Sequence, residues 1–375
     1  MIFTKKNATI NLLVIFLVVC VFFPGDPFHI KLISFFLILA LNISIVLKEL
    51  KKNDYLMFFG VLFPIILIFQ TFFVSHNLGS AISGAYPATL ILILPVVRHY
   101  DIKYDKYLLR IVGGSVLLIV LIVLIDFIGV VDINSPWFMR NAFYDYGMGI
   151  MGKSPMYSFY YKVFLKSSPL IVLLINDSLK KKKIIITALS ILAMLFTGTR
   201  ANVLLCVIFV LYVLAFNYEK KGKEKVIVTF LVVSILMFCF PLIYEYINEI
   251  MSSKGAIASD EIRDGQMRSF IEIFSDPFNL IFGMGLGSPF FNYGRNAYTT
   301  TAEFSYLELM RQIGVPLFVV FMYFVLKPLT SSISKQDKMT YICYLIIAFT
   351  NPLLFSSTAY LLYIFVYNNT IELKQ

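Results

Sequence analysis

Long apolar stretches separated by short polar turns make up most of this chain, and this succession limits its possible folds more than any other feature. Hydrophobic residues occupy 59% of the 375 positions and charged residues only 14%, and the mean hydropathy is +0.82. A soluble domain would have to expose much of this apolar surface to water. A lipid bilayer accepts it, and a membrane-spanning helix needs about 20 mainly apolar residues. The pattern therefore predicts an all-α, polytopic membrane protein.

About twelve segments qualify as spans, and they predict one membrane-embedded domain that covers residues 1–375. The last two segments can also be read as one helical hairpin. Two longer connections, 131–155 and 247–302, interrupt the pattern as a smaller and a larger extracytoplasmic loop. The predicted spans are 8–23, 30–47, 55–74, 84–98, 108–130, 156–176, 184–199, 201–217, 226–246, 303–326, 339–353 and 355–369.

The lysine-rich turns all fall on one side of this predicted bundle, at 48–52, 98–110, 180–183, 220–225 and 327–338. Cytoplasmic loops of membrane proteins carry an excess of Lys and Arg, so this side and both chain ends are predicted to be cytoplasmic. The formal net charge of +10 is thus a topology signal, and a nucleic-acid partner is not expected.

The arginines are distributed differently from the lysines. Nineteen of the lysines lie in the predicted cytoplasmic segments, whereas six of the eight arginines lie in the outer loops or the membrane. The planar guanidinium binds phosphate or carboxylate through two parallel hydrogen bonds, so an anionic ligand is expected on the outer side. Some of the six can instead pair with outer-loop acids. They are Arg140, Arg200, Arg263, Arg268, Arg295 and Arg311.

Residues 197–202 join two apolar runs with almost no loop, which places Arg200 at the outer rim of the membrane. A charge at that depth usually faces the protein interior or a water-filled cavity. A side chain that snorkels to the interface is the alternative.

Residues 259–276 predict an amphipathic helix within the large loop, with Ser259 as its N-cap and Pro277 as its end. Its apolar stripe suggests a lid on the membrane surface. Asp264 and Glu272 are each four residues from Arg268 and can pair with it, whereas Arg263 has a weaker set of local partners. Both arginines remain candidates for ligand binding.

A glycine-rich turn and a re-entry segment follow this helix. The amides around Gly283, Gly285 and Gly287 can approach a phosphate or simply make a tight return to the membrane. In the re-entry segment Glu303 stands at the membrane rim facing the arginines, which suits a general base for a hydroxyl group. Glu308 and Arg311, one turn apart, either pair with each other or contact the substrate.

The remaining candidates for substrate binding are Lys162 and Lys166 in the predicted sixth span, together with Tyr306 in the re-entry segment. The two lysines either snorkel outward or line the same cavity as the arginines. The three histidines and four cysteines have no metal-site spacing, so neither a metal nor a cofactor is predicted.

The order of these motifs resembles the bacterial O-antigen polymerase and ligase superfamily, most closely a Wzy-type polymerase. The resemblance covers about residues 190–320 and rests on Thr197–Arg200, the glycine-rich turn and the segment from Glu303 to Gly314. It implies a membrane-embedded glycosyltransferase of the C type in the bacterial inner membrane, acting in lipopolysaccharide biosynthesis. Arg200 and Arg263 would hold the pyrophosphate, and Glu303 falls where the family often carries His or Glu.

The implied reaction transfers a growing glycan from undecaprenyl pyrophosphate to the next lipid-linked repeat unit, with a chain-length regulator as a possible membrane partner. Two alternatives remain. A ligase would transfer the finished glycan to another acceptor, although ligases typically use a histidine that 247–302 lacks. A flippase of lipid-linked oligosaccharides would be no enzyme, but the gathering of charges in one outer loop argues against it.

Overall fold

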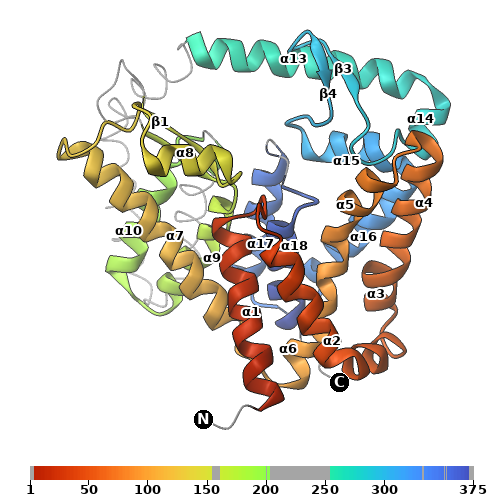
Figure 1. Cartoon of the computed structure of the whole chain (residues 1–375), viewed down its shortest axis with the longest axis horizontal. Helices are drawn as coiled ribbons and strands as arrows, with labels where there is room; N and C mark the ends of the chain where they lie inside the picture. The colour runs from red at the N-terminus through yellow and green to blue at the C-terminus, as the bar shows by residue number, and fades with distance from the viewer. Residues whose placement is uncertain are drawn as a thin grey trace, which may run out of the picture.

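The computed structural model describes residues 4–153, 161–199, 201–202, 254–331, 333–349, 351 and 353–370. Within these residues the chain is mostly helical, and the helices pack side by side into a bundle (Figure 1). Helix α13 lies across one end of the bundle, which we call the loop face, and the chain begins at the opposite end, the turn face.

The first third of the chain forms an apolar helical array. Five stretches of the described residues are long and apolar enough to cross a bilayer, and they correspond to the first five predicted spans. The largest change is at the fourth span, which starts at Leu78 instead of residue 84. The elements are α1 (Lys5–Phe22), α2 (Ile30–Leu50), α3 (Asp54–Met57), the π-helix η1 (Phe58–Leu62), α4 (Phe63–Ser75), α5 (Leu78–Thr89), the 3₁₀ helix η2 (Leu90–Leu92), α6 (Ile93–His99) and α7 (Tyr104–Phe127).

Two of these stretches change helix type where they pack together. Pro87 lies inside α5 and cannot donate a backbone hydrogen bond, and the helix tightens into η2 three residues later. Opposite it, Gly60 lies in η1, where an added Cβ would stand 2.3 Å from the Leu92 side chain. The absence of a side chain at Gly60 is what allows Leu92 to approach this closely.

The second part of the chain contains α8 (Phe138–Asp145), the 3₁₀ helix η3 (Ser168–Leu170), α9 (Ile171–Lys180) and α10 (Ile184–Phe196). The predicted span 156–176 is wrong over its described residues. Strand β1 (Gly149–Lys153) pairs antiparallel with β2 (Tyr161–Leu165), and only η3 and α9 follow as helix. In β2 the buried residues are Tyr161, Val163 and Leu165, a period of two that fits a strand and not a helix.

A polar contact fastens this hairpin to α7. The Asp126 carboxylate accepts hydrogen bonds from Lys153 Nζ at 2.9 Å and from the Tyr161 hydroxyl at 2.6 Å. The hydrogen bond to Asp126 holds the pKa of Lys153 above its ordinary value. Sequence reasoning missed this contact, because Asp126 and Tyr161 are far apart in the chain.

The large loop forms α13 (Lys254–Ser275), α14 (Pro277–Phe282), β3 (Phe290–Asn292) and β4 (Ala297–Thr299). The predicted end of the loop helix is confirmed, but its predicted start is wrong, because α13 is already helical at Lys254 and Ser259 lies inside it. The residues 254–258 are Lys, Gly, Ala, Ile and Ala, most of which favour helix and extend it backwards.

The last part of the chain consists of α15 (Ser305–Ile313), α16 (Val315–Thr330), α17 (Lys335–Phe349) and α18 (Ser357–Asn368). The predicted single span 303–326 is wrong, because Gly314 breaks it into α15 and α16. Gly314 has φ +76° and ψ 160°, a conformation that only glycine adopts without strain. Pro316 follows and starts α16 in its first turn.

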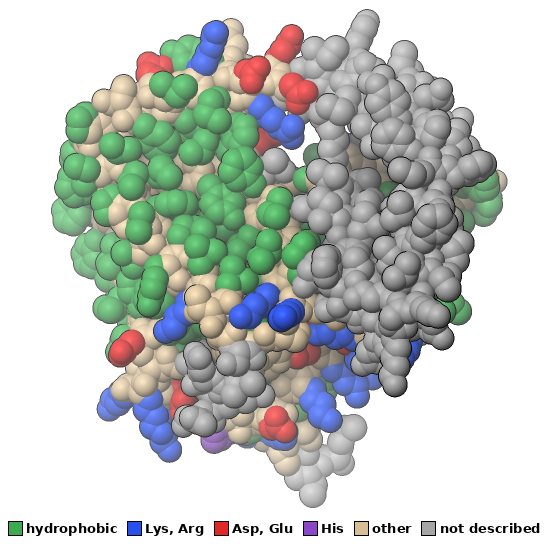
Figure 2. Space-filling view, turned by 180° about the vertical axis from the view of Figure 1, so that it is seen from behind, with side chains coloured by type: hydrophobic (Ala, Val, Ile, Leu, Met, Phe, Trp, Pro, Cys, Tyr) green, Lys and Arg blue, Asp and Glu red, His purple; other side chains and the backbone are tan. Residues whose placement is uncertain are grey.

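The count of about twelve spans stays a prediction. The span 226–246 and nearly all of 201–217 lie outside the described residues, while α10 and α16 are apolar but short. The two hairpins are additions to the predicted all-α architecture. The lysine-bearing turns after α2, α6, α9 and α16 lie at the turn face (Figure 1), and Figure 2 shows Lys and Arg side chains gathered beneath a broad hydrophobic face.

Candidate active site

Helix α13 presents one stripe of side chains to the rest of the loop face. Gln266, Ser269 and Phe270 are almost completely buried, at the spacing of a helical face. Phe270 packs with Phe290 of β3 and with Ala302 in a small apolar cluster. In contrast, Ile271 on the other side of the helix is 66% exposed. The predicted apolar stripe of this helix is therefore divided, and its inward half holds the β3–β4 hairpin.

Two glycines set the distance between α13 and this hairpin. A Cβ added to Gly265 would lie 2.2 Å from the backbone nitrogen of Gly294, in the turn between β3 and β4. A Cβ added to Gly294 would lie 2.0 Å from the carbonyl oxygen of Ile262. Backbone therefore touches backbone here, and no side chain fits between the two segments.

This contact brings three charged residues together from three segments. Arg263 of α13 donates from Nε to Oε2 of Glu303 at 3.2 Å, and Nη2 of Arg295 lies 3.8 Å from Oε1 of the same carboxylate. The side chains are 31%, 49% and 30% exposed for Arg263, Arg295 and Glu303. A carboxylate flanked by two arginines is thus accessible at the loop face.

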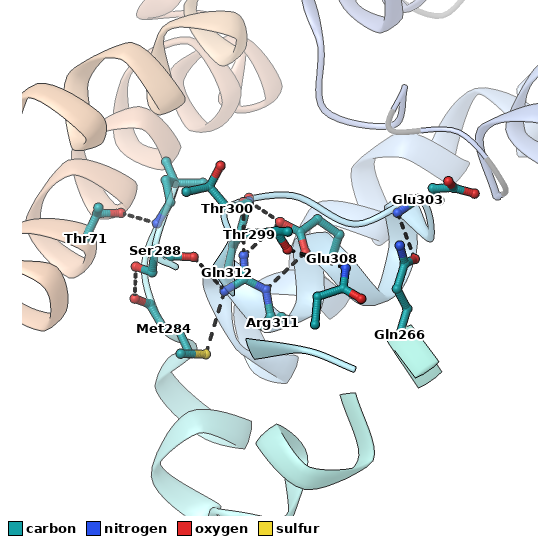
Figure 3. A network of polar contacts seen from close by, with 12 residues as sticks. Thr71, Gln266, Met284, Ser288, Thr299, Thr300, Glu303, Glu308, Arg311 and Gln312 are labelled. Atoms are coloured by element: carbon teal, nitrogen blue, oxygen red, sulfur yellow. Dashed lines mark hydrogen bonds and ion pairs between the residues drawn. The ribbon is translucent and has the colours of Figure 1, made fainter. Parts of the chain in front are cut away.

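A hydrogen bond to a side chain of α13 fixes the backbone at Glu303. Its backbone N–H donates to Oε1 of Gln266 at 3.2 Å, a bond drawn in Figure 3. Arg263 is also held by Asp260, whose Oδ1 lies 3.5 Å from its Nη1. Sequence reasoning missed Gln266, although its place one turn after Arg263 marks it as a residue of the same helical face.

Arg311 and Glu308 form a second, buried group beside this site. The guanidinium of Arg311 donates from Nε and Nη2 to the two carboxylate oxygens of Glu308, at 3.0 and 2.8 Å. It also donates to the backbone oxygens of Ser288 and Thr300 and stacks 4.4 Å from the Phe290 ring centre. Figure 3 shows Arg311 at the centre of this network, and its side chain is completely buried. Of the two roles considered for the pair, mutual ion pairing is the one that this geometry fits.

The glycine-rich turn uses its amides within the protein. The N–H groups of Met284 and Gly285 donate to the carbonyls of Arg311 and Gln312, and that of Leu286 donates to the Thr71 hydroxyl at 3.0 Å. The turn therefore makes a tight return that connects α15 to α4, and these three amides are not available to a phosphate.

The other predicted residues lie apart from this centre. Arg140 is on α8, and Arg268 is exposed on α13 without an ion pair to Asp264 or Glu272. Lys162 points outward from β2, and Lys166 follows that strand, where desolvation and the charge of Lys31 lower its pKa.

The rim motif packs on the β1–β2 hairpin. Gly198 has φ +63°, and an added Cβ would lie 2.5 Å from the carbonyl oxygen of Tyr161. Asn202 donates from Nδ2 to the hydroxyl of Thr197 at 3.2 Å, which closes the motif on itself. Arg200, its predicted functional residue, lies outside the described residues. Among the residues that are described, no group of three or more His, Cys, Asp or Glu side chains could hold a metal ion.

Part of the chain that forms the loop face matches a known protein family. Residues 185–322 match the model of the family described as O-antigen ligase. These residues are similar to the O-antigen ligase family. The superfamily predicted from the motifs is thereby confirmed, and its members transfer glycans as polymerases or ligases. No curated protein matches the chain.

The matched segment 185–322 contains what we call the charged centre, which is the Glu303 carboxylate with its two arginines and the buried pair beside them. It runs from α10 into α16 and includes Arg263, Arg295, Glu303, Glu308 and Arg311. Lys162, Lys166 and Arg140 lie before it. The family match and the structure therefore point to the same part of the chain.

The Gly265–Gly294 contact provides a test of this site. Gly265→Ala is expected to separate α13 from the β3–β4 hairpin, to move Arg263 away from Glu303 and to lower activity about 100-fold, since misplacement of reacting groups by about 1 Å costs that much. Activity is measured as glycan transfer by the purified protein in lipid. Gly79→Ala is the control, because its Cβ would meet nothing closer than 3.5 Å. Equal activity of the two variants would contradict the role given to the contact.

Proposed function

We propose that this chain is a polysaccharide polymerase of the bacterial cell envelope. It transfers a growing glycan from polyprenyl pyrophosphate to the next lipid-linked repeat unit, on the extracytoplasmic side of the inner membrane. The observation that carries the proposal is the accessible Glu303 carboxylate between Arg263 and Arg295. The lysines gathered at the turn face support the placement of the loop face on the outer side.

The chemistry of the transfer fits these side chains. The bond between the anomeric carbon and the phosphate oxygen breaks, and the acceptor hydroxyl forms the new glycosidic bond. Glu303 takes the proton of that hydroxyl as general base. Negative charge develops on the departing pyrophosphate, which Arg263 and Arg295 stabilise through donors already beside Glu303. Arg200 is assigned to the same pyrophosphate from the sequence.

The buried pair takes a positioning role in this proposal. Arg311 joins Glu308 to the backbone at Ser288 and Thr300, three residues before Glu303. The pair therefore holds the segment that carries the base. Tyr306, whose hydroxyl donates to the carbonyl of Leu345 at 2.9 Å, fixes the next turn of α15 to α17.

A ligase remains the second candidate, since the family description itself names that activity. The polymerase is preferred because the loop 247–302 contains no histidine, which ligases typically use. The two differ in the acceptor: a second lipid-linked repeat unit for the polymerase, and another glycan or lipid core for the ligase.

The deciding experiment is glycan chain length on gels, in cells that lack the gene. If the protein is a polymerase, its loss leaves single repeat units attached to the final acceptor. If the protein is a ligase, its loss leaves long polymer stranded on the lipid carrier. If no repeat unit reaches the outer side, the protein is a transporter and the assigned site is wrong.

Arg263→Lys keeps the charge but loses the planar fork of donors, and it is expected to lower the transfer rate about 10- to 100-fold, the value of a charged hydrogen bond. Transfer is measured with purified protein and lipid-linked repeat units. Arg110→Lys, at an exposed position of α7, is the matched control and should retain activity. Full activity of Arg263→Lys would remove Arg263 from the phosphate site.

A further inference from the structure

An apolar groove runs between α16 and α17 on the bundle. Its volume is about 360 Å³, and its surface is almost entirely apolar. The residues that line it come from three helices: Tyr306 of α15, Leu326 and Leu329 of α16, and Ile342, Leu345, Ile346 and Phe349 of α17. Ile346 is 48% exposed and Phe349 is 49% exposed, so the groove opens sideways to the surroundings of the bundle.

The groove follows the direction in which a lipid chain lies in a membrane. Helix α16 runs from the loop face to the turn face, and α17 returns (Figure 1). Leu329 is close to the end of α16 at the turn face, whereas Phe349 is the last residue of α17, toward the loop face. From Ile342 to Phe349 alone, the helix rises about 10 Å at 1.5 Å per residue.

The upper end of the groove adjoins the charged centre. The Phe349 ring lies 5.6 Å from the ring of Tyr306 and 6.2 Å from that of Phe304. Phe304 is the residue next to Glu303, so these ring contacts join the upper end of the groove to the segment that carries the carboxylate. Tyr306 contributes no free polar group to these contacts, because its hydroxyl donates to the carbonyl of Leu345.

An apolar groove whose upper end contacts the segment of Glu303 and its two arginines suits one class of ligand. A lipid with a long hydrocarbon chain and a pyrophosphate head group satisfies both parts at once. A phospholipid also fits the groove, but its single phosphodiester offers two arginines less negative charge than a pyrophosphate does. We propose that the groove between α16 and α17 binds the isoprenoid chain of the polyprenyl pyrophosphate donor, with the pyrophosphate at Arg263 and Arg295. This inference rests on the proposed function and extends it to the lipid part of the substrate.

Photolabelling tests the groove directly. Undecaprenyl pyrophosphate that carries a photoreactive diazirine in its chain is added to the full-length protein in lipid nanodiscs and irradiated. We expect the label on the α17 peptide that contains Ile342 and Ile346. Excess unlabelled undecaprenyl pyrophosphate should reduce the label, and excess undecaprenol, which lacks the head group, should not.

A filled groove provides the matched variant. Ile346→Trp should displace a part of the chain equal to about two CH₂ groups and lower specific labelling about tenfold. Leu121→Trp on α7, where Leu121 is 53% exposed outside the groove, should leave labelling unchanged. Equal labelling of α2, α7 and α17, or equal competition by undecaprenol, would overturn the proposal.

The transfer assay separates this inference from the proposed function. If the protein elongates glycans but α17 is not specifically labelled, the groove assignment is wrong and the polymerase stands. If α17 is labelled with the expected competition but no glycan is transferred, the groove holds a pyrophosphate lipid and the polymerase assignment falls.

Discussion

Replacement of Glu303 by glutamine is expected to lower the rate of glycan transfer about 100- to 10,000-fold, the usual contribution of a general base. Glutamine keeps the shape of the side chain and cannot take a proton. It also removes the charge that Arg263 and Arg295 share, so both arginines stay available to the donor pyrophosphate. The rate is measured with purified protein and lipid-linked repeat units, and donor binding is measured separately.

The pattern of the two measurements distinguishes a base from a structural carboxylate. A base that is lost lowers turnover and leaves donor affinity the same or higher. Glu261→Gln, at an exposed position of α13, is the matched control and should behave like the wild type. If Glu303→Gln weakens donor binding and leaves turnover unchanged, Glu303 is not the base.

Replacement of Glu308 by glutamine should cost about 3–5 kcal/mol of stability, because it leaves the fully buried guanidinium of Arg311 without its counter-charge. The free energy of unfolding is measured by denaturant titration in detergent micelles. The comparison is Asp177→Asn, which removes an exposed pair with Lys181 on α9 and should cost no more than about 1 kcal/mol.

A double substitution tests whether burial of charge is the cause. Glu308→Leu combined with Arg311→Met removes both charges and should recover a large part of the lost stability, although the bonds to Ser288 and Thr300 are lost as well. If Glu308→Gln costs no more than Asp177→Asn, the pair does not hold the loop as described.

Hydropathy was sufficient to predict the helical array, because each apolar stretch is a local signal. The first five spans are found within a few residues of their predicted positions. The hairpin of β1 and β2 was missed because hydropathy reads only the local apolar content and not how a strand pairs. The strand Tyr161–Leu165 continues directly into the apolar η3 and α9, so the whole run resembles one span. Its alternation extends over only five residues, too few to outweigh a long apolar window.

The charged centre was partly predictable. The position of Glu303 at the re-entry segment, facing a set of arginines, could be inferred from topology. Which arginines it meets could not, because Arg295 reaches it only through the tertiary contact of Gly265 with Gly294. For Glu308 and Arg311, the spacing of three residues revealed the pair, but only the packing of Ser288, Phe290 and Thr300 around it defines its burial.

Helix α13 and the β3–β4 hairpin meet through main-chain atoms at two glycines, so the exposed side chains of the loop do not set the distance between them. The spacing of the charged groups depends on main-chain atoms at Gly265 and Gly294. The exposed hairpin positions, such as Tyr298 at 75% exposure, have no part in that spacing. Under the proposed function, exchange of exposed side chains on this loop would change which sugar it contacts, while the charged residues keep their spacing.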